Sequence, residues 1–219
     1  MKPDNKITLW HCHNARSLRP LWALEEMGID YQLQVLPFPP RFLHKEFLAI
    51  NALGTVPYMV DGDTHMTESS AMCHYLAARY QHTEFFVARD HAEYGSFLNW
   101  LYHSDATLTF PQTIYLRYAI MEPVERRQAQ VADDYRKWYL ARLRLLDSHI
   151  LGKKFLCDSR FTIADIAIGY ALFLGESLGF ADDYSAQVSD YLKQLKQRPA
   201  FSRSIALTES LELEKPDFS

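Results

Sequence analysis

The order of secondary-structure signals along the chain constrains its fold more than any other feature. Up to about residue 83, the sequence predicts short strands and helices in the order β-α-β, connector, β-β-α. After that point the strand signals cease. Four later segments share the apolar spacing of helices: residues 88–121, 124–150, 162–178 and 185–196. The sequence therefore predicts an α/β domain over residues 1–83 joined to an all-α domain over residues 88–219.

A strand–helix–strand unit opens the first of these domains. The run KITLW is rich in residues that favour strands, and YQLQVL alternates, with Tyr31, Leu33 and Val35 on one face. Helix-forming residues fill positions 15–27 between the two runs, and Gly28 suits the left-handed conformation that ends many helices. This order predicts a βαβ unit with a right-handed crossover.

A hairpin and a helix complete the predicted first domain. The stretch VPYMVDGDTHMT predicts two short strands around Asp61-Gly62-Asp63, a sequence typical of tight hairpin turns. The following stretch, ESSAMCHYLAARY, has the spacing of an amphipathic helix. We therefore expect the hairpin to be followed by an amphipathic helix that closes this domain.

The composition of the 219-residue chain argues against several kinds of partner. Its net charge is −4 and it has no long run of Lys and Arg, so we expect no nucleic acid partner. It has no secretory signal and no apolar stretch of about 18 residues, so we expect no membrane partner. Three cysteines, Cys12, Cys73 and Cys157, are too few for a disulfide framework. We therefore expect a soluble, cytoplasmic protein with reduced thiols.

The start of one helix in the second domain is clearly marked. In FTIADIAIGYAL, Thr162 fits an N-cap whose hydroxyl accepts a hydrogen bond from the N3 amide, and Asp165 can reach back to the Thr162 amide. Phe161 and Ile166 stand at the two positions of a hydrophobic staple. We interpret this pattern as a device for folding and not for chemistry.

Three segments, in register along most of the chain, resemble the cytosolic glutathione S-transferase family. The stretch NALGTVPYMVDGDTHMTESSAMCHYLAARY is similar to the family's N-P-x-G-x-V-P segment, its hairpin and its E-S helix start. LRPLWALEEMG resembles the family's first helix, and FTIADIAIGYAL its buried capping-box helix. Ala52 departs from the pattern, since proline commonly follows the residue at Asn51. The resemblance implies a thioredoxin-like N-terminal domain, an all-helical C-terminal domain and a homodimer.

The resemblance also implies where glutathione binds. The family pairs the backbone at Val56, before Pro57, with the cysteinyl part of glutathione, and an X-Pro bond at this position can be cis. Glu68 and Ser69 stand at a helix start, where backbone amides and the helix dipole attract a carboxylate, so they suit the γ-glutamyl end. From the residues alone, the alternatives are a rigid turn and an N-cap. Three basic residues are candidates to meet the glycine carboxylate: Arg41, His44 and Lys45.

The candidate catalytic residues lie in the loop after the first strand. Cys12 precedes a helix N-terminus, where the helix dipole and Arg16 or Arg19 would lower its pKa and favour the thiolate. No resolving cysteine follows it, a pattern similar to glutathione transferases that use cysteine. Asn14 and Ser17 are the alternatives, because their side chains can hydrogen-bond the thiolate of bound glutathione. Of the three, Cys12 is preferred.

Metal ligation is a further interpretation of the same loop. His11, Cys12 and His13 are all metal-ligand types, but consecutive residues do not easily converge on one tetrahedral ion. No second cluster in the sequence completes a set of four ligands. We therefore expect no metal site.

The resemblance implies an enzyme of detoxification that transfers glutathione, as cosubstrate, to small electrophilic substrates. One alternative is thiol–disulfide exchange with a disulfide substrate through Cys12. Another is a non-catalytic protein of the same fold that serves as a binding or regulatory module, since fold does not determine function. The presence of both Val56-Pro57 and Glu68-Ser69 favours the enzyme, because a module without glutathione binding need not keep them.

Overall fold

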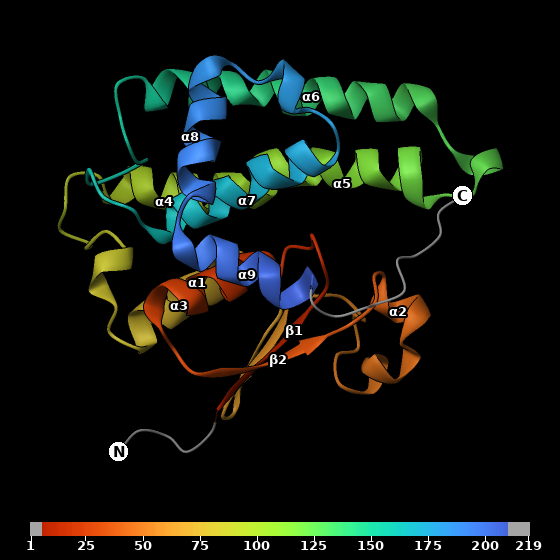
Figure 1. Ribbon diagram of the computed structural model, residues 1–219, viewed down its shortest axis with the longest axis horizontal. Helices are drawn as coiled ribbons and strands as arrows, with labels where there is room; N and C mark the ends of the chain where they lie inside the picture. The colour runs from red at the N-terminus through yellow and green to blue at the C-terminus, as the bar shows by residue number, and fades with distance from the viewer. Residues whose placement is uncertain (1–5, 210–219) are drawn as a thin grey trace. The chain divides into compact units, whose positions relative to one another are not determined.

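The computed structural model describes residues 6–209, and the chain divides into two compact units (Figure 1). The first unit contains the chain up to His82 together with the last described helix, α9 (Pro199–Glu209). The second unit runs from Thr83 to Lys196. The sequence did not indicate that α9 groups with the first unit. The predicted domain limits, 1–83 and 88–219, stay a prediction.

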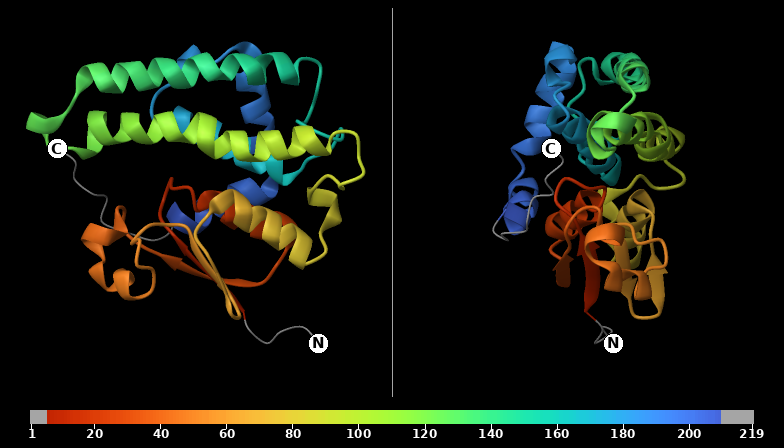
Figure 2. Two further views of the ribbon diagram at one scale, coloured as in Figure 1. Left: turned by 180° about the vertical axis from the view of Figure 1, so that it is seen from behind. Right: turned by 90° about the vertical axis from the view of Figure 1, so that its right-hand side faces the viewer.

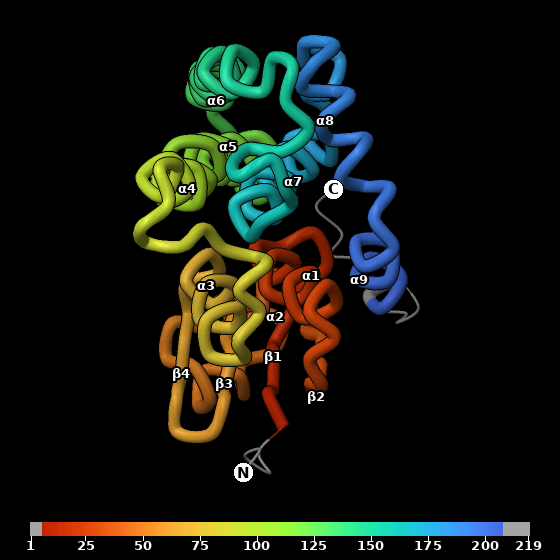
Figure 3. The backbone as a smooth tube through the Cα atoms, turned by 90° about the vertical axis from the view of Figure 1, so that its left-hand side faces the viewer, coloured from red at the N-terminus to blue at the C-terminus, as the bar shows by residue number. Residues whose placement is uncertain are grey.

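A four-stranded mixed sheet lies at the centre of the first unit. Its strands are β1 (Ile7–His11), β2 (Tyr31–Val35), β3 (Tyr58–Asp61) and β4 (Thr64–Met66). Figure 3 shows their order, β2-β1-β3-β4. β1 and β2 are parallel, whereas β3 runs antiparallel to both β1 and β4. The predicted βαβ unit and the predicted hairpin are therefore confirmed.

Helices α1 (Leu18–Met27) and α3 (Ser69–Arg79) pack side by side in this unit (Figure 1), and α2 (Pro40–Leu43) is a single short turn. Gly28 ends α1 with a φ of 61°, and its amide bonds to the Leu24 carbonyl, as expected for a left-handed C-terminal stop. Leu21 of α1, Met59 of the sheet and Met72 of α3 are wholly buried. The core of the unit therefore lies between the sheet and these two helices.

Helix α9 is fastened to α1 by both polar and aromatic contacts. The Arg198 guanidinium, one residue before α9, donates to both carboxylate oxygens of Glu26, at 2.5 and 2.8 Å. The Trp22 indole N–H donates to the same carboxylate at 2.9 Å. The Trp22 ring meets the Phe201 ring edge-on, with 4.9 Å between centroids. The polar atom of this fully buried indole is thus satisfied within α1, and α9 covers its ring.

The second unit is built from helices alone. One long helical segment consists of α4 (Tyr94–His103), α5 (Phe110–Leu116) and two π-helical stretches, Ser104–Thr109 and Arg117–Met121. Figure 2 shows α6 (Ala129–Ile150) alongside this segment. Helices α7 (Ile163–Ser177) and α8 (Ala186–Lys196) complete the unit, and every residue from Ile163 to Leu172 is buried. The predicted fold class, an α/β part followed by an all-α part, is confirmed.

The predicted capping box is present at the start of α7. The Thr162 hydroxyl accepts from the Ala164 amide at 3.3 Å, and the Asp165 carboxylate accepts from the Thr162 amide at 2.8 Å. The second oxygen of Asp165 accepts from the Leu156 amide at 3.0 Å and from the Tyr191 hydroxyl at 2.7 Å. Burial raises the pKa of Asp165 to about 6. This carboxylate therefore links the loop before α7, the start of α7 and α8. The predicted hydrophobic staple stays a prediction.

Candidate functional site

The loop between β1 and α1 carries all three candidate catalytic residues. Cys12 follows the last residue of β1, as the sequence predicts, and Ser17 immediately precedes α1. Asn14, between them, has a φ of 55°, a left-handed conformation that asparagine adopts more readily than most residues. The Ala15 amide donates to the Cys12 carbonyl at 3.2 Å, so the chain turns sharply at this point. The three side chains consequently differ in their access to solvent.

Cys12 is enclosed in the core of the first unit. It packs in a cluster with Leu36, Phe47 and Tyr58, and its side chain is wholly buried. Burial raises the pKa of the Cys12 thiol to about 12, because the thiolate would lose its hydration. The expectation of a lowered pKa is therefore wrong: desolvation outweighs the dipole of α1 and the nearby arginines. The thiol proton points at the Pro37 carbonyl, 3.7 Å away.

Ser17 and Asn14 occupy different environments. Ser17 is wholly buried, and its hydroxyl oxygen accepts a hydrogen bond from the Cys12 amide at 3.2 Å. Asn14 is half-buried, so it is the candidate of the three with the most exposed side chain. The bond from the Cys12 amide to the Ser17 hydroxyl closes the loop around Asn14. Which of the three faces the glutathione sulfur stays a prediction.

The Val56-Pro57 segment adjoins this loop. The bond between the two residues is cis, as the sequence analysis allowed, and Val56 packs against the same cluster that encloses Cys12. Asn51 holds the preceding turn: its side-chain amide donates to the Thr55 carbonyl at 2.9 Å, and its oxygen accepts from the Leu53 amide at 3.1 Å. The structure therefore brings Val56 and Cys12, predicted separately, into one part of the first unit.

Glu68 and Ser69 lie at the N-terminus of α3. Glu68 is the N-cap residue and is exposed, and its side chain makes no capping hydrogen bond. Ser69, the first helical residue, is 2% exposed. Its hydroxyl accepts a hydrogen bond from Arg19 at 2.9 Å, and Arg19 is wholly buried in the first turn of α1. The start of α3 is thus tied to the start of α1, two residues beyond Ser17.

Sequence reasoning treated Arg19 only as a charge near Cys12 and missed its contact with Ser69. The available signal was a charged residue within an apolar stretch, since Leu18, Leu21 and Trp22 surround it in the sequence. The three basic candidates for the glycine carboxylate lie together in the segment around α2. Arg41 and Lys45 are exposed and His44 is half-buried, so the structure does not select among them.

His11, at the end of β1, is a buried titratable group that sequence reasoning considered only as a metal ligand. Its ring is 1% exposed, and burial lowers its pKa to about 4 despite the opposing effect of the Ser17 backbone. Between pH 6.5 and 4 the unfolded chain therefore binds this proton and the folded chain does not. Stability contributed by neutral His11 is present above pH 6.5 and is lost as the pH falls through this window.

We expect His11 to cause about 3 kcal/mol of the loss in unfolding free energy between pH 6.5 and 4. His11→Phe should reduce the loss by that amount, because phenylalanine fills the site and takes up no proton. Urea unfolding at pH 6.5, 5 and 4 measures how the unfolding free energy changes with pH. His13→Phe, at an exposed neighbouring position, is the control. Parallel slopes for the parent and His11→Phe would contradict the assignment.

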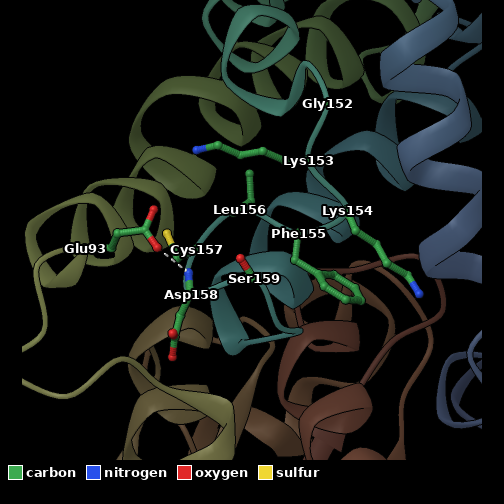
Figure 4. Close-up of a pocket in the computed structure, with 9 residues that line it drawn as sticks. All are labelled: Glu93, Gly152, Lys153, Lys154, Phe155, Leu156, Cys157, Asp158 and Ser159. Atoms are coloured by element: carbon green, nitrogen blue, oxygen red, sulfur yellow. Dashed lines mark hydrogen bonds between the residues drawn. The ribbon is translucent and has the colours of Figure 1, made fainter.

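A pocket of about 230 Å³ lies in the second unit, between Glu93 and the loop before α7 (Figure 4). The Glu93 carboxylate accepts a hydrogen bond from the Asp158 amide at 2.6 Å across its edge. Cys157 also lines it, and burial raises the pKa of that thiol to about 11. None of the site residues predicted from the sequence lines this pocket, which belongs to the helical unit alone.

Within residues 6–209, no three His, Cys, Asp or Glu side chains are grouped so that they could hold a metal ion. None of the helices described in this range combines the length and apolar character needed to cross a bilayer.

Comparison with known proteins identifies relatives of the chain. A family model described as "Glutathione S-transferase, N-terminal domain" matches residues 15–79. Glutathione S-transferase 3 of Schizosaccharomyces pombe is 23% identical over 206 residues, which cover 89% of this chain and 84% of that protein. Human glutathione S-transferase theta-2 is 31% identical over 153 residues, which cover 60% of this chain and 59% of that protein.

A solved structure extends the likeness to the fold. The glutathione transferase URE2P6 from Phanerochaete chrysosporium, in complex with oxidized glutathione, is 25% identical to this chain with a TM-score of 0.79. The match covers 95% of this chain and 99% of that one. The predicted architecture, a thioredoxin-like N-terminal part followed by a helical part, is confirmed by this likeness.

Proposed function

Because the chain belongs to the glutathione S-transferase family, we propose that it is an enzyme that transfers glutathione to small electrophilic substrates. Glutathione is its cosubstrate. The observation that carries the proposal is the start of α3, where a buried serine hydroxyl and an exposed carboxylate stand side by side at a helix N-terminus. Such a pair complements the carboxylate and the ammonium group of a γ-glutamyl residue.

The proposed glutathione site has two parts. Ser69 and the N-terminal amides of α3 bind the γ-glutamyl carboxylate, and Glu68 pairs with its ammonium group. The backbone of Val56, before the cis proline, pairs with the cysteinyl part. Two contacts support one continuous site. Val56 packs against the cluster that contains Cys12, and the hydrogen bond from Arg19 to Ser69 joins α1 to α3. Isothermal titration of the parent protein with glutathione tests the site, and the absence of binding at millimolar concentration would refute it.

For the reacting thiol, burial favours conjugation over thiol exchange. Thiol–disulfide exchange requires an accessible thiolate, whereas the Cys12 thiol is enclosed and its pKa is raised. A conjugating transferase instead needs a donor that stabilises the thiolate of glutathione itself. Asn14 is the candidate with such a donor and a partly exposed side chain. We therefore assign this task to Asn14, with Ser17 as the alternative.

We expect Cys12→Ser to change kcat/KM for conjugation of chlorodinitrobenzene by less than about threefold, whereas Asn14→Ala should lower it by about 10–100-fold. The reason is that a thiolate stabiliser acts in the transition state, while a core thiol acts only through stability. Thiol exchange with hydroxyethyl disulfide should be negligible in the parent.

If the parent catalyses thiol exchange and Cys12→Ser abolishes that activity, the assignment to Asn14 is overturned and Cys12 is the catalytic residue. Cys73→Ser serves as the matched control, because Cys73 is also a wholly buried thiol of the first unit. If Cys12→Ser and Cys73→Ser change kcat/KM for conjugation equally, both substitutions act only by perturbing the packing of the core.

We further propose that the enzyme is cytoplasmic, acts in detoxification and forms a homodimer. The first unit leaves apolar side chains of residues 42–53 exposed, the kind of surface that oligomers bury. These side chains are 42–62% exposed: Phe42, Leu43, Leu48, Ile50 and Leu53. The dimer predicted from the sequence places residues 68–81 against the partner's helical domain.

A further inference from the structure

Arg19 and Ser69 form a hydrogen bond that is unusual in its burial. The guanidinium of Arg19 is 0% exposed, the Ser69 side chain is 2% exposed, and Nη1 of Arg19 lies 2.9 Å from Oγ of Ser69. A fully buried arginine costs free energy unless its charge meets a suitable partner. Ser69 is one of the partners of Arg19, and its hydroxyl is neutral.

The chemistry of the pair determines the direction of the bond. A guanidinium has donors only, so Arg19 must donate and the Ser69 oxygen must accept. The hydroxyl proton of Ser69 therefore points away from Arg19. In residues 6–209 the Ser69 side chain makes no second hydrogen bond. Ser69 is thus held as a donor whose proton has no acceptor in the described structure, next to the N-terminal amides of α3.

We infer that Arg19 is a positioning residue of the glutathione site, which orients the Ser69 hydroxyl toward the carboxylate of the γ-glutamyl residue. The inference rests on the proposed function. Arg19 acts in two ways: it occupies the acceptor side of Ser69, and it places a positive charge beneath the positive end of the α3 dipole. Both effects favour an anion at Ser69, and neither requires Arg19 to touch the ligand.

If Arg19 orients Ser69, replacing Arg19 should weaken the binding only of a ligand that carries the γ-glutamyl carboxylate. Two ligands that differ in this group test the expectation. Glutathione and γ-aminobutyryl-cysteinylglycine differ only in the γ-glutamyl carboxylate. In the parent, glutathione should bind more tightly than this analogue. In Arg19→Met, which keeps length and removes charge and donors, glutathione affinity should fall at least tenfold while analogue affinity changes less than twofold. Arg19→Lys should recover glutathione binding to within about fivefold of the parent, since it keeps a charge and a donor.

A core variant of the same helix separates positioning from stability. Leu24→Ala, at a wholly buried position of α1, should lower the melting temperature and leave the ratio of the two affinities unchanged. If Arg19→Met weakens both ligands equally, or neither, Arg19 is only a structural cross-link and the inference is overturned. A parent that binds neither ligand would instead refute the proposed function, and the role of Arg19 with it.

A mutant cycle keeps the test decisive if Arg19→Met does not fold. Arg19→Lys and Ser69→Ala are measured singly and together by isothermal titration with glutathione. Because Arg19 acts through Ser69, Arg19→Lys should change affinity less than twofold once Ser69 is alanine, although it has a measurable effect in the parent. Independent effects in the two backgrounds would overturn the inference.

Discussion

Replacing Glu68 by Gln and Ser69 by Ala in one variant is expected to weaken glutathione binding by two to four orders of magnitude. Each residue offers a hydrogen bond to a charged group of the ligand, and the loss of such a bond costs about 1.5–3 kcal/mol. Glu68 is exposed and makes no capping bond, so its replacement leaves α3 intact. Isothermal titration measures the affinity, and circular dichroism verifies the fold.

Ser70→Ala is the matched control for this variant. Ser70 is the next residue of α3 and is also buried, but it has no place in the proposed site. We expect its affinity for glutathione to stay within a factor of two of the parent. If the double variant binds as tightly as Ser70→Ala, glutathione does not bind at the start of α3.

The second large effect is expected on stability: Asp165→Ala should lower the unfolding free energy of the second unit by about 3–5 kcal/mol. The substitution leaves four donors without their acceptor in a buried site: the amides of Leu156 and Thr162 and the hydroxyls of Thr162 and Tyr191. Part of the loss is offset, because the variant no longer buries a charged carboxylate. Urea unfolding followed by circular dichroism at pH 7.5 measures the difference.

Asp165→Asn separates shape from charge at the same site. Asparagine keeps one acceptor oxygen, so we expect a smaller loss than for alanine. The parent should also gain stability from this residue as the pH falls from about 6 to 3.8, since the folded state takes up the proton first when its pKa is raised. Neither variant should show this gain. A loss below about 1 kcal/mol for Asp165→Ala would contradict the importance given to this carboxylate.

Features that depend on near neighbours in the chain were predictable from sequence. The alternation of YQLQVL specifies one half-buried and one exposed face of β2, and Gly28 supplies the left-handed stop of α1. The capping box at Thr162 and Asp165 is equally local, because its two partners are three residues apart. Such patterns determine an element wherever it later packs.

Features that depend on distant packing were not predictable. The pKa of Cys12 was expected to fall because the sequence shows the helix and the arginines beside it. The structure raises it, because Leu36, Phe47 and Tyr58, which arrive from later segments, exclude water from the thiol. The contact of Arg19 with Ser69 joins residues fifty positions apart, so no local pattern reveals it. The sequence therefore predicts which residue types form the site, but not their protonation states or the hydrogen bonds that orient their side chains.

The position of α9 has a consequence for the order in which this protein matures on the ribosome. Chains are synthesised from the N-terminus and their domains generally fold as units, in order of emergence. Here the first unit begins to emerge first but is completed last, because Trp22 packs against Phe201 and Glu26 pairs with Arg198, which are both synthesised late. The whole helical unit is translated in between. The nascent sheet must therefore remain without α9 until that helix has been synthesised, and it is exposed to chaperones and proteases for longer than its early synthesis would suggest.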